Sequence, residues 1–116
     1  YSPDAELLLF RGPDAAVYAV MRDHALQLMA DGHAVGLLVR NDELAHFEDL
    51  KAPAALLGSD ETTMARSLFA GIRQLDGLAL DAILARMPDE KGLGLAVSDR
   101  LLRAAEGRII DVTAPL

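Results

Sequence analysis

The residues whose spacing points most directly to chemistry are two glycines, Gly92 and Gly94, at the start of an amphipathic run. A helix that begins there presents free backbone N–H groups, which can bind an anion. Arg11 ends an earlier apolar segment and is followed by Gly12, so it would add a positive charge at the same edge of a sheet. One interpretation is therefore an anion or nucleotide site formed by Arg11, Gly12, Gly92, Leu93 and Gly94.

The other interpretation is structural, because two glycines also allow a tight turn and close packing of a helix on a sheet. The third glycine of the dinucleotide-binding fingerprint is absent from this stretch, and no Walker A lysine pattern occurs in the chain. These departures favour the structural interpretation.

Histidines do not form a metal-ligand pattern. His24, His33 and His46 fall in three different segments, and their spacing is not that of a metal site. We therefore predict no metal.

Carboxylates and hydroxyls likewise give no catalytic set. Asp89 and Glu90 stand beside Lys91 in a charged loop, where a solvated loop is favoured over acid–base chemistry. Ser98 and Asp99 have no histidine near them in sequence, so nothing supports a triad. We predict no catalytic residue in this chain.

The elements that must position these residues follow from hydrophobic periodicity and from capping signals. Apolar runs predict strands over residues 5–10, 34–39, 54–57, 80–86 and 109–112. Helical spacing predicts helices over 13–31, over 93–105, and from the capping cluster at 58–61 to residue 76, with a weak helical signal over 43–50.

This alternation predicts an α/β fold with helices on both faces of a mainly parallel, five-stranded, doubly wound sheet. The strand order that we predict is 3-2-1-4-5. Such a sheet binds ligands at the carboxyl ends of the strands where the order reverses, here between the first and fourth strands.

Length, composition and net charge exclude further classes of function. The 116 residues are enough for one domain, and 52% of them are apolar, as in a globular protein. The net charge of −7 argues against direct binding of nucleic acid. No apolar run is long enough to span a membrane, and the absence of cysteine is compatible with a reducing compartment, so we expect a cytoplasmic location.

Ordered short motifs along the chain resemble a known family. They occur at residues 1–3, 57–59, 65–70, 73–76, 83–85, 92–96, 99–101 and 104–105. In this order they are similar to the C-terminal domain of long-form L-threonylcarbamoyladenylate synthases, the YrdC-type enzymes that carry an extra domain.

The resemblance implies a Rossmann-like accessory domain over 4–116, preceded by the end of an interdomain linker at Tyr1, Ser2 and Pro3. An N-terminal YrdC-like domain of the same chain would be the partner and would carry the chemistry. It would join ATP, with magnesium, to L-threonine and bicarbonate, giving threonylcarbamoyl-AMP and pyrophosphate for the N6-threonylcarbamoylation of tRNA adenosine. The accessory domain would support closure of the linker over that active site, and a homodimer is left open.

Two alternatives remain. The chain is a module that senses a nucleotide or another small anion, or it is an independent doubly wound enzyme of the response-regulator or flavodoxin kind. The second alternative is disfavoured, because neither the acidic cluster with lysine of a phospho-receiver nor an aromatic pair for a flavin is visible.

Overall fold

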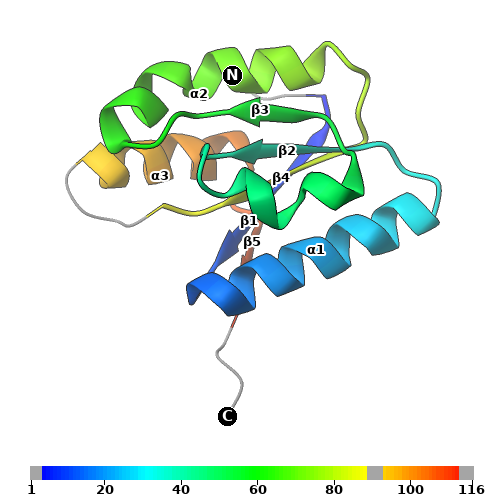
Figure 1. Ribbon diagram of the computed structural model, residues 1–116. Coiled ribbons are helices and arrows are strands. Elements are labelled where there is room, and N and C mark those ends of the chain that lie inside the picture. The colour runs from blue at the N-terminus through cyan, green and yellow to red at the C-terminus, as the bar shows by residue number, and fades with distance from the viewer. Residues whose placement is uncertain (1–3, 89–92, 113–116) are drawn as a thin grey trace.

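A computed structural model describes residues 4–88 and 93–112 of the chain. Strands and helices alternate almost throughout (Figure 1). The elements are β1 (Glu6–Arg11), α1 (Asp14–Ala30), β2 (Val35–Val39), the 3-10 turns η1 (Leu44–His46) and η2 (Glu48–Leu50), β3 (Ala54–Leu56), α2 (Glu61–Asp76), β4 (Ala82–Arg86), α3 (Leu93–Ala104) and β5 (Ile109–Asp111). The predicted strands and helices are confirmed, and the weak signal over 43–50 corresponds to the two 3-10 turns.

The five strands form one parallel sheet in the order β3-β2-β4-β1-β5. The α/β doubly wound class is confirmed, but the predicted order 3-2-1-4-5 is wrong, because β1 and β4 exchange places. The pairs β3–β2 and β4–β1 are as predicted. In place of the predicted neighbours, β2 pairs with β4, and β1 pairs with β5.

The burial of the strands is consistent with the exchange, although it does not by itself select one strand order. In β4, the four residues from Ala82 to Ala85 are all buried, whereas β1 starts at the exposed Glu6 and ends at the exposed Arg11. A strand that is apolar on both faces belongs in the centre of a parallel sheet. Strand β1, with charged ends, lies one place from the edge, where the short β5 pairs only with its carboxyl-terminal half.

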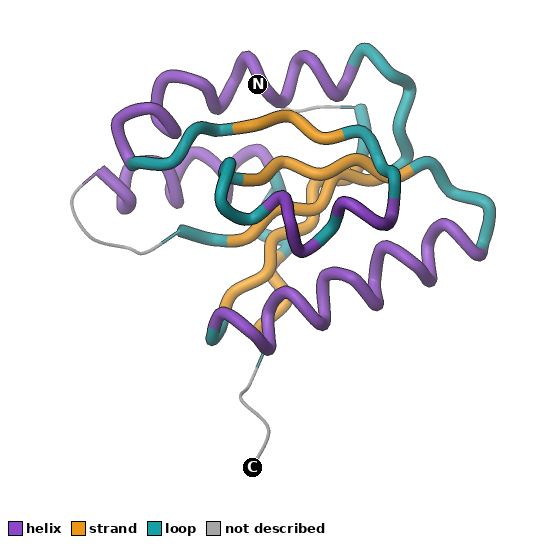
Figure 2. Tube along the Cα trace, viewed as in Figure 1, coloured by secondary structure: helices purple, strands orange, loops and turns teal. Residues whose placement is uncertain are grey.

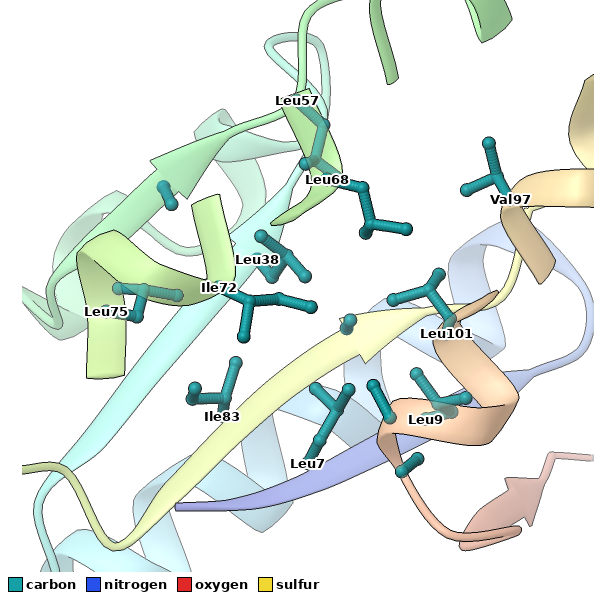
Figure 3. Close-up of a cluster of buried hydrophobic side chains, with 14 of the residues drawn as sticks. Leu7, Leu9, Leu38, Leu57, Leu68, Ile72, Leu75, Ile83, Val97 and Leu101 are labelled. Carbon is teal, nitrogen blue, oxygen red and sulfur yellow. The ribbon is translucent and has the colours of Figure 1, made fainter. Parts of the chain in front are cut away.

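Two apolar cores, one on each face of the sheet, make the fold three-layered. Helices α2 and α3 cover one face, where Leu68, Ile72 and Leu101 pack against β1, β2 and β4 (Figure 3). Helix α1 and the 3-10 turns cover the other face, as Figure 2 shows. The right-handed crossovers of a parallel sheet place helices in this way.

Local signals set the helix ends as the sequence predicts. The Asp60 side chain caps α2 by accepting a hydrogen bond of 2.8 Å from the backbone N–H of Thr63. After α1, Gly32 adopts a φ of +88°, the left-handed conformation that glycine accepts without strain. In the described part of the chain, no helix is both long and apolar enough to cross a bilayer.

Candidate functional site

A small pocket lies at the carboxyl ends of β1, β2 and β4, and we call it the carboxyl-edge pocket. Its volume is about 150 Å³. It is lined by Asp14, Arg40, Glu43, Met64, Arg86, Met87 and Pro88. Four of these seven side chains are charged, so the pocket is polar although it lies directly above the apolar sheet.

Topology creates the crevice. After β1 the chain passes into α1 on one face of the sheet, whereas after β4 it passes to α3 on the opposite face. Neighbouring strands whose connections diverge in this way leave an opening at their carboxyl ends, which is where doubly wound sheets bind ligands. The exchange of β1 and β4 keeps these two strands adjacent and adds β2 to the same opening.

A chain of hydrogen bonds through Tyr18 connects charged residues that line the pocket. Arg86 Nη1 donates to the Tyr18 hydroxyl at 3.0 Å, and this hydroxyl donates to Glu43 Oε2, also at 3.0 Å. The second oxygen of Glu43 accepts a hydrogen bond of 2.8 Å from the backbone N–H of Arg40. Arg86 Nη2 donates to the Gly12 carbonyl at 3.0 Å. These bonds join three segments that are distant in sequence, residues 12–18, residues 40–43 and Arg86.

Two ion pairs lie at the rim of the pocket. Arg86 Nη2 is 2.5 Å from Asp14 Oδ1, and Arg40 Nη2 is 3.0 Å from Asp42 Oδ2. The arginine side chains are 17% and 32% exposed, but their acidic partners are 79% and 59% exposed. The positive charges are therefore the inner members of both pairs.

Burial and neighbouring charges shift the pKa values of Tyr18 and Arg86. The pKa of Tyr18 is raised, first by burial and then by the nearby Glu43 carboxylate. Burial lowers the pKa of Arg86, but hydrogen bonds with Asp14 and Tyr18 outweigh it, and the net shift is upward. Tyr18 thus stays protonated and Arg86 stays charged at neutral pH, which suits binding better than proton transfer.

Arg11, one of the predicted anion-site residues, lies at the carboxyl end of β1 beside β5. Arg11 is the register partner of Asp111 on β5, and its Nε and Nη2 donate to the Asp111 carboxylate at 2.7 and 3.1 Å. Gly12, in contrast, belongs to the pocket framework through its carbonyl. Its φ is +152°, and an added Cβ would collide with the Val112 carbonyl oxygen.

The remaining predicted residues are only partly described. Leu93 and Gly94 begin α3. Gly92, and the linker residues Tyr1, Ser2 and Pro3, lie outside the described residues. The anion site predicted at the start of α3 therefore stays a prediction.

Sequence reasoning missed Tyr18, Arg40, Glu43 and Arg86 as a group. The available signal was that Arg40 and Arg86 each fall at the carboxyl end of a predicted parallel strand, where ligands bind. Across residues 4–88 and 93–112, no three histidine, aspartate or glutamate side chains are grouped so as to hold a metal ion.

The fold and the position of the pocket define the class of protein. It is a doubly wound α/β domain with a polar crevice at the point where the chain leaves neighbouring strands toward opposite faces of the sheet. The sequence matches the family described as "Threonylcarbamoyl-AMP synthase, C-terminal domain" over residues 1–106, and the chain belongs to this family.

Relatives agree with this assignment. The chain is 34% identical to the threonylcarbamoyl-AMP synthase of Pyrococcus abyssi and 26% identical to that of Bacillus subtilis, covering 97% and 95% of this chain but 31% of each relative. It thus spans about a third of their length.

Solved structures of relatives have the same fold. The structure of Pyrococcus abyssi Sua5 complexed with L-threonine matches with a TM-score of 0.81 and 32% identity, covering 97% of this chain and 31% of that one. A C-terminal Sua5 domain from Pyrococcus horikoshii, crystallised by itself, matches with a TM-score of 0.70 and 30% identity, covering 97% of this chain and 100% of that one.

Proposed function

We propose that this chain is the accessory C-terminal domain of a threonylcarbamoyl-AMP synthase and does not catalyse the reaction itself. The reaction of ATP, L-threonine and bicarbonate, for tRNA modification in the cytoplasm, belongs to an N-terminal domain of the longer protein. Two findings support this proposal: the family assignment, and the coverage of only 31% of each curated relative. ATP with its magnesium is assigned to that other domain, because the carboxyl-edge pocket of about 150 Å³ is well below the usual size of a drug-sized ligand site.

The observation that carries the docking role is the composition of α1. This helix buries Val17, Met21 and Ala25 against the sheet, yet apolar side chains also lie on its solvent side. Leu26 and Met29 are 47% and 38% exposed. The α1 outer face, as we name it, consists of Ala15, Ala19, Leu26, Met29 and Ala30, all exposed.

A shallow groove adjoins this face. Its volume is about 340 Å³, and it is lined by Val20, Asp23, His24, Gln27 and Leu28. Arg22 does not interrupt the apolar surface with a free charge, because its guanidinium donates to Asp49 and to the His46 carbonyl. Exposed apolar patches that are rimmed by polar residues mark interaction sites.

The occupant of the α1 outer face that we propose is the N-terminal domain of the same protein. The relatives carry about two-thirds of their length outside the matched region, so a partner domain is present at high effective concentration. Docking would fix the orientation from which the linker, whose edge we predict at Tyr1, Ser2 and Pro3, closes over the active site.

The test compares Leu26→Lys/Met29→Lys with the control Leu78→Lys, which alters a leucine that is 52% exposed in the connection between α2 and β4. In the full-length protein, the double variant should lower threonine- and bicarbonate-dependent pyrophosphate release and separate one unfolding transition into two. The isolated chain should change in stability by no more than about 0.5 kcal/mol, as for other surface changes. Since a relative's C-terminal domain has been crystallised by itself, the isolated chain is a reasonable control.

Three results would contradict the proposal. The first is robust pyrophosphate release by the isolated chain. The second is a double variant that behaves like Leu78→Lys in the full-length protein. The third is a concentration-dependent dimer of the isolated chain that Leu26→Lys abolishes, since this would make a second copy the occupant of the α1 outer face.

A second candidate function, sensing of a small anion, is favoured by the two arginines that line the carboxyl-edge pocket.

A further inference from the structure

One hydrogen-bond donor of the carboxyl-edge pocket lacks an acceptor in the part of the chain that the structure describes. Arg40 Nε is buried and has no hydrogen-bond partner among the described residues. The facing oxygen, Glu43 Oε1, is 3.7 Å away, which is beyond hydrogen-bond distance. Buried donors without acceptors are rare in folded proteins because each costs free energy. An acceptor brought by a ligand would remove this cost.

The acidic partners at the rim are open to solvent. The side chains of Asp14 and Asp42 are 79% and 59% exposed, so an incoming anion can reach the same guanidinium groups from solvent. Glu43 differs, because its side chain is 6% exposed and its oxygens are held by Tyr18 and by the Arg40 backbone. An incoming anion would therefore compete with Asp14 and Asp42 for the guanidinium groups, while Glu43 keeps its hydrogen bonds.

Geometry limits the size and the class of the ligand. A volume of about 150 Å³ admits a group of a few heavy atoms rather than a whole nucleotide. Guanidinium groups bind planar or tetrahedral oxyanions through paired N–H donors. The strand register places Arg86, at the end of β4, next to the segment that follows β2 and carries Arg40.

We propose that the carboxyl-edge pocket binds a small oxyanion, of the size of phosphate or of a carboxylate group, between Arg40 and Arg86. This site is separate from the predicted one at Arg11 and the start of α3. It is also independent of docking through α1, so the two proposals fail on different results.

The test uses nuclear magnetic resonance of the isolated chain, following the arginine Nε–H signals. Sodium phosphate and sodium acetate distinguish the two oxyanion classes, and sodium chloride at equal ionic strength is the control. We expect a saturable shift of the Arg40 Nε–H signal with at least one oxyanion and no saturable shift with chloride. Arg40→Gln should weaken binding by about tenfold, the effect of losing one charged hydrogen bond.

A gain of affinity provides a test that misfolding cannot mimic. Asp42→Asn removes the rim competitor of Arg40 and should tighten oxyanion binding several-fold. The matched control is Asp111→Asn, which removes the carboxylate partner of Arg11 at the β1–β5 edge and should leave affinity unchanged.

Three results would overturn the proposal. The first is no saturation by either oxyanion up to about 10 mM, which would mean a binding free energy weaker than roughly −3 kcal/mol. The others are an equal response to chloride, and equal tightening of oxyanion binding by Asp111→Asn and Asp42→Asn.

Discussion

The hydroxyl of Tyr18 on α1 donates a hydrogen bond of 3.0 Å to Oε2 of Glu43, a buried carboxylate in the connection between β2 and β3. The same hydroxyl accepts a hydrogen bond from Arg86. Two charged residues of the pocket lining are therefore connected by a phenol that accepts from Arg86 and donates to Glu43.

Removing this hydroxyl should destabilise the domain. Tyr18→Phe keeps the ring, which stacks on His46 with a centroid separation of 4.2 Å, but leaves Glu43 short of a donor. We expect a loss of about 1–3 kcal/mol in the free energy of unfolding by urea. In a double-mutant cycle, adding Glu43→Gln should cost less than it does in the wild type. Additive effects would show that the two residues are not coupled.

The phenol of Tyr18 should ionise at a higher pH in the folded chain than in the unfolded chain. Burial and Glu43 raise its pKa above the usual value of 10.0. Because the pKa in the folded state is raised, this contribution to stability is complete below the pKa of the unfolded chain and is lost as pH rises through the folded pKa. Absorbance at 295 nm should show one tyrosine of the folded chain ionising at higher pH than in urea. Tyr18→Phe should abolish that step, and a late step that persists in this variant would assign it to the other tyrosine.

The cap of α2 should contribute to stability in a pH-dependent manner. Hydrogen bonds from the backbone and side chain of Thr63 lower the pKa of the Asp60 carboxyl. Its contribution is therefore present above the pKa of the unfolded chain and is lost as pH falls through the folded pKa. Asp60→Ala should lower the melting temperature at pH 7 by roughly 4–8 °C. Asp60→Asn, which still caps, should lower it much less at pH 7; equal losses would argue against the cap.

Two glycines with positive φ offer a matched pair. At Gly12, φ is +152° and an added Cβ would collide with the Val112 carbonyl. At Gly32, φ is +88° and no atom lies within 4 Å of the added Cβ. Gly32→Ala should therefore cost about 1 kcal/mol from backbone strain, as in other left-handed positions. Gly12→Ala should cost clearly more and should also disturb the carbonyl that accepts from Arg86. Equal costs in urea denaturation would contradict the steric argument.

The core and the α1 outer face should respond differently to the same truncation. Ile72 of α2 is fully buried against the sheet, whereas Leu26 of α1 is 47% exposed. In the isolated chain, Ile72→Ala should cost about 2–5 kcal/mol, the range for buried aliphatic side chains. Leu26→Ala should cost at most about 0.5 kcal/mol. A large cost at Leu26 in the monomeric isolated chain would mean that α1 packs differently from the structure.

Much of the fold was predictable because local residue patterns determine where the strands and helices form. The uniformly apolar run ending at Val39 identifies a parallel strand buried on both faces, and Asp60 marks the start of α2. Helix α1 was located correctly, but its apolar residues surround the whole helix, so periodicity alone did not show that Tyr18 faces inward.

By itself, the sequence determined the elements, their parallel arrangement and the layers, because each depends on the chemistry of neighbouring residues. Only the tertiary structure decided which strands are adjacent, since both strand orders satisfy the same apolar patterns and crossover handedness. Pairing β1 with β5 joined Arg11 to Asp111, and pairing β2 with β4 brought the segment carrying Arg40 beside Arg86. The candidate site depends on that choice, because its charged residues come from segments that only the sheet brings together.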